Sequence, residues 1–171
     1  MRHAILLLSL LAAAACNGVT TLPSPRAPLP AEPGGGGGTP AASALEAEIH
    51  ALVNRRRADR RLPPLQWDDR IAAEARAHSQ AMASGGRPFG HDGFETRAAR
   101  LGELMTVRSM AENVAYDSRE GSQLGEQVVQ GWIASAGHRQ NIDGSFTRTG
   151  IGVARRADGT RYFTQIFIND G

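Results

Sequence analysis

The sequence predicts an α+β domain in which helices come first and strands close the fold. Apolar residues recur at helical spacing from Leu45 to Met82. Apolar and polar residues alternate over 111–116, and two further strand-like segments flank Asp158 and Gly159, a turn pair typical of a β-hairpin. Helices followed by strands favour a layered arrangement around one core.

The first helix is predicted to begin at Ser43, because Ser43 and Glu46 have the spacing of a capping box. Pro63 and Pro64 end it, since a proline ring disfavours helical backbone at and before its own position. Its last turns carry five arginines: Arg55, Arg56, Arg57, Arg60 and Arg61. Positive charge is favourable at a helix C-terminus, so we interpret the cluster as a solvated face, with a docking patch for anionic lipid or polysaccharide as the alternative.

A second helix is predicted to follow Asp68 as its N-cap and to stop at Gly85. His78 lies on the apolar face of that helix, so we expect a hydrogen-bonded, partly buried histidine there rather than a site residue. The loop 87–93 then holds His91 between turn residues, and loops on rigid scaffolds are where functional side chains concentrate. His91 is therefore the candidate site histidine, with a turn histidine that caps backbone groups as the alternative.

A short helix is predicted over 94–101 and a strand over 111–116. On that strand Glu112 shares one face with Val114 and Tyr116. Burying an unpaired carboxylate is costly. Glu112 therefore needs a partner, which we expect to be an imidazole or a metal.

The apolar spacing from Leu124 to Trp132 predicts a third long helix that ends near Gly137. The chain then closes with a hairpin over 149–168. On its second strand Gln165 shares a face with aromatic residues. We expect this amide to orient a neighbouring polar group.

The N-terminal segment 1–16 has the features of an export signal. A basic head at Arg2 precedes an apolar run over 4–15 that is too short to cross a bilayer as a helix. Cys16 is the only cysteine and follows three alanines, a pattern that resembles a bacterial lipoprotein signal with Cys16 as the lipidated residue, although Ala13 stands where leucine is usual. The alternative is an ordinary secretory signal cut nearby. Either predicts a domain that works outside the cytoplasm and folds without a disulfide.

Residues 17–42 are rich in proline, alanine and glycine and are predicted to be a disordered tether. Residues 43–171 are long enough for one domain with one core. The net charge is only +2. Such a weak positive field, on an exported chain, argues against nucleic acid as a partner.

Polar motifs occur in a recognisable order in the C-terminal half of the chain. AEN at 111–113 opens a strand, WIASAGHRQN at 132–141 spans a helix end, and QIF at 165–167 lies in the closing hairpin. With His91 upstream, this order resembles the CAP superfamily (cysteine-rich secretory proteins, antigen 5, pathogenesis-related 1) in its bacterial, SCP-like form without disulfides. The resemblance covers about residues 43–169.

The resemblance implies an α-β-α sandwich, with a small, mostly antiparallel sheet between helices and a cleft over one end. In that family two histidines and two acidic residues converge in the cleft. His91 matches the first histidine, Glu112 the first acid and His138 the second histidine, while Ser135 stands where the second acid is expected. The expected ligand-binding cleft comprises His91, Glu112, Ser135, His138, Asn141 and Gln165.

A metal is one ligand that this cleft could hold. The resemblance implies that His91, Glu112 and His138 could bind Zn²⁺ or another divalent metal, with water in the fourth position. Ser135 in place of a second acid weakens the case for a metal.

Three functions are compatible with the cluster. It could be a structural hydrogen-bond network, or a binding site for a metal, a lipid or sterol-like amphiphile or a cell-wall component. It could also be a hydrolase, either protease or esterase-like, in which Ser135 and His138 share one helical face and Glu112 orients His138. No nucleophile elbow accompanies that serine. We therefore favour a monomeric binding module of the bacterial cell envelope, tethered to the membrane by a lipid anchor, over an enzyme.

Overall fold

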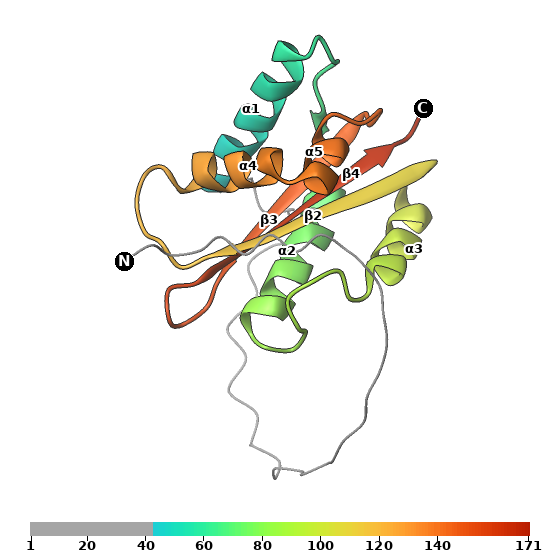
Figure 1. The fold of residues 1–171 in the computed structure, drawn as a ribbon. Helices are drawn as coiled ribbons and strands as arrows, with labels where there is room; N and C mark the ends of the chain where they lie inside the picture. The colour runs from blue at the N-terminus through green and yellow to red at the C-terminus, as the bar shows by residue number, and fades with distance from the viewer. Residues whose placement is uncertain (1–42) are drawn as a thin grey trace.

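The computed structural model describes residues 43–171, which form five helices and a four-stranded sheet (Figure 1). The elements are α1 (Ala44–Asp59), β1 (Gln66–Trp67), α2 (Asp69–Ala83), α3 (Phe94–Leu104), β2 (Ser109–Asp117), α4 (Leu124–Ala134), α5 (Ala136–Ile142), β3 (Arg148–Arg155) and β4 (Arg161–Asn169). The predicted signal segment 1–16 with Cys16 and the predicted tether 17–42 lie outside the described residues. Over 43–171, no helix combines the length and the apolar character needed to span a membrane.

The sheet has the strand order β1-β3-β4-β2, which places β2 at one edge. β1 pairs in parallel with β3, and the other two pairings are antiparallel. Figure 1 shows α1, α4 and α5 on one side of the sheet and α2 and α3 on the other. The α+β class and the α-β-α sandwich with a mostly antiparallel sheet are therefore confirmed.

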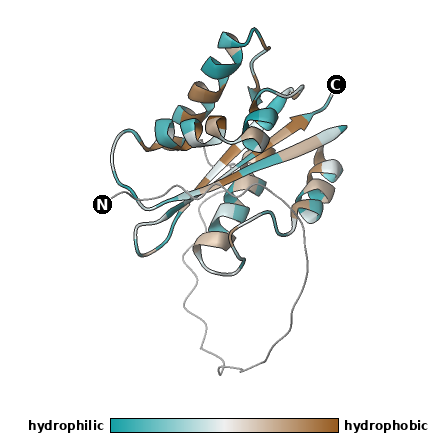
Figure 2. Cartoon of the chain, in the orientation of Figure 1, coloured by the Kyte–Doolittle hydropathy of each residue, from teal (hydrophilic) through white to brown (hydrophobic). Residues whose placement is uncertain are grey.

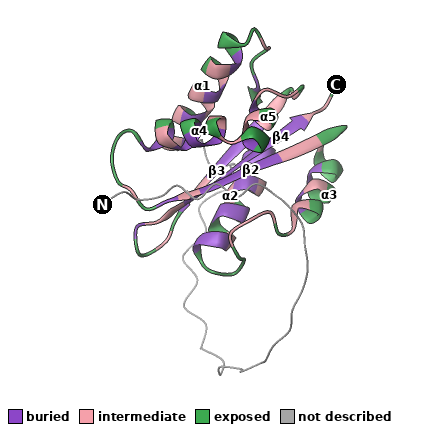
Figure 3. Ribbon diagram, viewed as in Figure 1, coloured by how far each residue is buried: buried purple, intermediate pink, exposed green. Residues whose placement is uncertain are grey.

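Hydrophobic residues are buried on both faces of the sheet, because side chains of β4 alternate between the two faces. Phe163 and Phe167 pack with Trp132 beneath α1 and α4. Ile166 and Ile168 pack on the opposite face, against α2 and α3. The strands are buried where helices cover them, and the outer helix surfaces are exposed (Figure 3). Hydropathy follows the same division, with hydrophobic stretches along the sheet and hydrophilic stretches on the helices (Figure 2).

The predicted helix starts are confirmed. Ser43 and Glu46 form the capping box of α1, and Asp68 caps α2 by accepting a hydrogen bond from the N–H of Arg70. The arginine cluster at the end of α1 is a solvated face only in part. Arg57 is buried and donates hydrogen bonds to the backbone carbonyls of four residues beyond α1: Pro63, Ile142, Gly144 and Phe146. It thereby ties the end of α1 to the segment that follows α5.

Helix α2 lies in backbone contact with β3. A Cβ atom on Gly150 would lie 2.1 Å from the backbone nitrogen of Ala72, and one on Gly152 would lie 2.1 Å from that of Arg76. No real Cβ atom tolerates such a distance, so the two glycines allow the close packing. The position of α2 in turn places His78 against the sheet.

The prediction of one long helix that continues to Gly137 was wrong. Helix α4 ends at Ala134, Ser135 adopts extended backbone (φ −88°, ψ 125°), and α5 begins at Ala136. Ser135 is thus the single residue between the two helices, the C-cap of α4 and the N-cap of α5. Because the backbone changes direction there, Ser135 and His138 do not share the face of a single helix.

Candidate functional site

A cleft of about 480 Å³ opens at the edge of the sheet between α3, β2 and α5. Its walls come from the loop before α3, the start of α3, the edge strand and the junction of α4 with α5. The lining residues are His91, Phe94, Glu95, Ala111, Glu112, Ser135, Gly137, His138, Gln140 and Asn141. Five of the six residues predicted for the cleft lie in it, and Gln165 does not.

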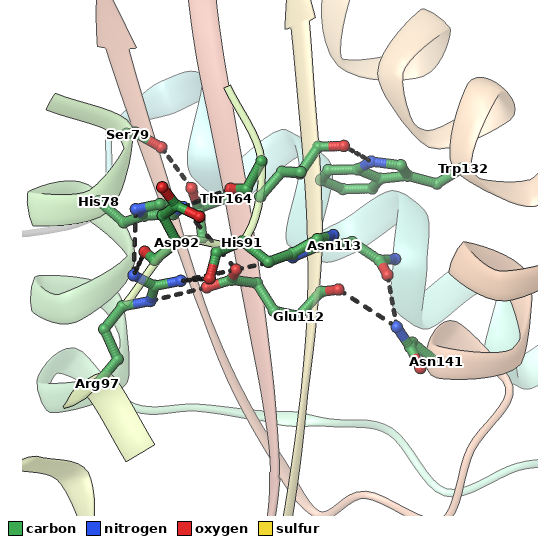
Figure 4. A network of polar contacts seen from close by, with 12 residues as sticks. His78, Ser79, His91, Asp92, Arg97, Glu112, Asn113, Trp132, Asn141 and Thr164 are labelled. Carbon is green, nitrogen blue, oxygen red and sulfur yellow. Dashed lines mark hydrogen bonds and ion pairs between the residues drawn. The ribbon is translucent and has the colours of Figure 1, made fainter. Parts of the chain in front are cut away.

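At the centre of the site Glu112 is held by a buried arginine (Figure 4). The Nε of Arg97 donates to Oε2 of Glu112 at 2.9 Å, and its Nη2 donates to Oε1 at 2.8 Å. His91 Nδ1 donates to the same Oε1 at 2.9 Å. The predicted imidazole partner of Glu112 is confirmed, but the main partner is Arg97.

Arg97 was missed in the sequence. It precedes the buried Leu101 by four residues, so it lies on the face of α3 that packs on the sheet. A cation on an inward helical face, near a carboxylate on an inward strand face, is the signal that could have identified the pair.

His78 extends this network beneath the cleft. Its Nε2 donates to the carbonyl of Gly90 at 2.8 Å, and its Nδ1 accepts from Nη1 of Arg97 at 3.2 Å. These two contacts require a neutral imidazole with its proton on Nε2. Burial, the largest effect, lowers the pKa of His78, although the nearby Glu112 opposes this. The expectation of a buried, hydrogen-bonded histidine at this position is confirmed.

On the opposite wall, His138 is buried and Ser135 is half-buried, and each has one buried polar atom without a partner. Nδ1 of His138 and Oγ of Ser135 have no hydrogen-bond partner within residues 43–171. Burial lowers the pKa of His138, and the neighbouring His91 lowers it further. No hydrogen bond joins these two atoms, and Glu112 pairs with Arg97 instead of His138. The serine, histidine and glutamate expected for a hydrolase are therefore not linked by hydrogen bonds.

The two amide side chains predicted for the cleft, those of Asn141 and Gln165, lie in different places. Asn141 lines the cleft and donates through Nδ2 to Oδ1 of Asn113 at 2.9 Å and to the carbonyl of Glu112 at 3.3 Å. Gln165 is fully buried on β4 and donates to Thr149 Oγ1 at 3.1 Å. Because β4 lies one strand in from the edge, the Gln165 side chain does not line this cleft.

The expected metal ligands are brought near one cleft without forming a metal centre. His91 contacts Glu112, and His138 lines the same cavity. Over 43–171, no group of three or more His, Cys, Asp or Glu side chains has an arrangement that could hold a metal ion. The guanidinium of Arg97 also places a fixed positive charge at the carboxylate. Zn²⁺ binding here stays a prediction.

The layered fold and the polar cleft at the sheet edge define an α-β-α domain with a cleft at one edge of the sheet. The chain belongs to the CAP family, described as the cysteine-rich secretory protein family, whose model matches residues 50–167. It is 32% identical over 135 residues to the uncharacterized protein YkwD of Bacillus subtilis, covering 74% of this chain and 48% of the relative. It is also 32% identical over 127 residues to the uncharacterized membrane protein YlbC of that organism, covering 72% and 34%. The chain thus spans half or less of these relatives.

Solved structures have the same fold. An extracellular SCP-domain protein of Bacillus anthracis superposes with a TM-score of 0.60 at 30% identity, covering 73% of this chain and 40% of that one. An outer surface protein of Borrelia burgdorferi gives 0.64 at 16% identity, covering 74% and 93%. A manganese-bound structure of Ac-ASP-7 gives 0.52 at 14% identity, covering 80% and 76%. The last two likenesses concern the fold alone.

Proposed function

We propose that this chain is a binding module that holds a small envelope ligand, with a polar group and an apolar part, in the cleft between α3, β2 and α5. One observation carries the proposal. Oγ of Ser135 and Nδ1 of His138 are buried in the cleft wall without hydrogen-bond partners in the described chain. Buried polar atoms are nearly always hydrogen-bonded, and leaving them unpaired costs free energy. A ligand that forms hydrogen bonds with both atoms recovers that cost.

The remaining walls favour an amphiphilic ligand over a bare cation. Phe94 and Ala111 supply apolar surface, and the charge of Glu112 is matched by Arg97. The guanidinium of Arg97 already neutralises that carboxylate, which weakens its attraction for a divalent cation. The metal is therefore the second candidate ligand, held through the imidazoles of His91 and His138.

The export predicted from the N-terminal sequence supports an envelope ligand. The N-terminal segment has the pattern of a signal ending at Cys16, and the Bacillus anthracis neighbour is an extracellular protein by its description. We infer that the module works outside the cytoplasm, held at a membrane by a lipid on Cys16.

Catalysis is the less favoured use of the cleft. A serine hydrolase needs a hydrogen bond between Ser135 and a base, and a third group that orients this base. Oγ of Ser135 has no partner within 43–171, and Glu112 is engaged by Arg97. Turnover would require the cleft to rearrange.

The test is to purify the full chain from the envelope of its native host and identify the small molecules that it retains by mass spectrometry. We expect one retained compound at near-stoichiometric amount, lost in Ser135→Ala and His138→Ala. The matched control is Gln80→Ala, an exposed position on α2 away from the cleft, which should retain it. If no compound is retained, or if the cleft variants retain it equally, the binding proposal is rejected. Hydrolysis of ester or peptide substrates that depends on Ser135 would favour the hydrolase instead.

A further inference from the structure

The edge strand β2 presents unpaired backbone groups to the cleft, and their identity follows from the hairpin. The N–H of Arg156 donates to the carbonyl of Thr160 at 2.7 Å, so this is a hydrogen-bonded pair of the β3-β4 ladder. In an antiparallel ladder such pairs recur every second residue. Residues Tyr162, Thr164, Ile166 and Ile168 of β4 therefore direct their backbone groups to β3.

The alternate residues of β4 direct their backbone groups to β2. These include Gln165 and Phe167, which lie opposite Asn113 and Ala111. The backbone N–H and C=O groups of Ala111 and Asn113 therefore form hydrogen bonds with β4. The intervening Met110 and Glu112 direct theirs outward, away from the sheet.

Side chains occupy two of the outward carbonyls of this edge. Trp132 Nε1 donates to the carbonyl of Val114, and Asn141 Nδ2 donates to the carbonyl of Glu112, both at 3.3 Å (Figure 4). These donors come from the helices that cover the edge. The carbonyls of Val114 and Glu112 are therefore not available to an added strand.

The other end of the edge stays open. The N–H and C=O of Met110 and the N–H of Glu112 have no hydrogen-bond partner in the described part of the chain. Met110 is half-buried, and β2 becomes exposed toward Ser109 (Figure 3). Ala111 and Glu112 line the cleft, so the open groups border the cavity that holds the unpartnered atoms of Ser135 and His138.

We propose that the ligand of the cleft is an extended peptide segment that adds to the sheet at Met110 and Glu112. This inference rests on the proposed binding function and names its ligand class. Donor and acceptor groups that face outward at every second residue are the complement of another strand, and main-chain pairing of this kind is a recurrent mode of peptide recognition. A lipid tail or a metal ion offers no such repeat.

The same geometry sets the length of the paired segment. Asn141 occupies the carbonyl of Glu112, so pairing stops there. Three backbone groups remain, enough to hold a short stretch of peptide. Its side chains then lie beside Phe94 on one wall and beside Ser135 and His138 on the other.

The experiment pans a random hexapeptide library against the full chain and then uses the most enriched peptide as a synthetic probe. The key variant is Met110→Pro, which removes one outward N–H. The ladder to β4 is left intact, because proline is tolerated on an edge strand where its N–H would face outward. Met110→Ala is the matched control, since it shortens the side chain and keeps the N–H.

We expect Met110→Pro to bind the probe about tenfold more weakly than Met110→Ala, because one backbone hydrogen bond is lost. The probe should also slow hydrogen exchange at the amides of Met110 and Glu112, with no further effect at Ala111. The same peptide N-methylated at every amide should not bind. Equal affinity of the two variants, or binding without slower exchange at those two amides, overturns the strand pairing.

The outcomes also distinguish the peptide inference from the proposed binding function on which it rests. If no hexapeptide is enriched, yet Ser135→Ala and His138→Ala still abolish retention of a compound from the envelope, the peptide inference is overturned and the binding function is kept. If neither a peptide nor a retained compound is found, both are overturned.

Discussion

Arg97 and Glu112 form a buried two-point contact in which two guanidinium donors each reach one carboxylate oxygen, at 2.8 and 2.9 Å. The pair joins α3 to the edge strand β2. It also holds His91, whose Nδ1 shares one of the oxygens, at the mouth of the cleft. The polar centre of this domain is thus built around an ion pair.

Removing one member of this pair should strongly lower the free energy of unfolding. We expect Arg97→Met to lower the free energy of unfolding by about 3–5 kcal/mol, because it leaves the Glu112 carboxylate buried without its cation. Adding Glu112→Gln should recover part of the loss, as measured by urea denaturation in a double-mutant cycle. Arg100→Met is the control, since Arg100 is half-exposed in its pair with Glu74 and should cost at most about 1 kcal/mol. Equal costs for the two arginines would show that the buried pair has no special weight.

The close packing of α2 on β3 predicts a strong effect of one added methyl group. Gly152→Ala places its Cβ against the backbone of Arg76 and should destabilise by about 3 kcal/mol, as overpacking against rigid backbone does. Gly102→Ala, in α3 with no atom within 4 Å of the added Cβ, should instead stabilise by about 0.5–1 kcal/mol. Thermal melts of the two variants check the contrast, and a Gly152→Ala protein that melts like the wild type would refute it.

Stability should fall as the pH drops below about 6.5, the ordinary pKa of histidine in an unfolded chain. Burial lowers the pKa of His78 and of His138 in the folded state, so the unfolded chain binds more protons in that range. The stability is complete above about pH 6.5 and is lost between that value and the lowered folded pKa values. The double variant His78→Gln and His138→Gln should lose less stability between about pH 7 and pH 5 than the wild type does. An unchanged pH dependence in urea titrations would contradict this account.

Zn²⁺ should bind the cleft only weakly. The carboxylate expected as a ligand is held by Arg97, which leaves the imidazoles of His91 and His138. Binding should weaken further as the pH falls, because protonated imidazoles cannot coordinate. Calorimetric titration should show the weak binding lost in His91→Ala and kept in Ser135→Ala. Tight binding that survives His91→Ala would point to a different site.

The lipid anchor is a prediction from Cys16, which lies outside the described residues. Cys16→Ser should move the protein from the membrane fraction to the soluble fraction, because the thiol that would carry the lipid is removed. Fractionation followed by immunoblotting measures this, and metabolic labelling with a fatty acid should label only the wild type. A wild-type protein without label, with unchanged fractionation of the variant, would reject the anchor.

Local signals in the sequence predicted much of this fold. Helix starts were readable because Ser43 and Asp68 cap with their own side chains, and the histidine loop and the Glu112 strand followed from spacing. Features that depend on tertiary packing could not be predicted from the sequence. Nothing near Ser135 marks the change of backbone direction that divides α4 from α5. Arg97 is revealed only when α3 is laid on the sheet, since a charge on an inward helix face has meaning through its partner.

Arg57 has a mechanical consequence for the cleft. Its guanidinium is bonded to backbone carbonyls at and beyond the end of α5, from a position inside α1. These hydrogen bonds attach helix α5, which carries His138 and Asn141, to the long helix α1. A cleft with one wall anchored in this way can widen only by displacement of the other wall. A guest too bulky for the resting cavity would have to displace α3 and the loop of His91, and that displacement breaks the contacts of Arg97 and His91 with Glu112.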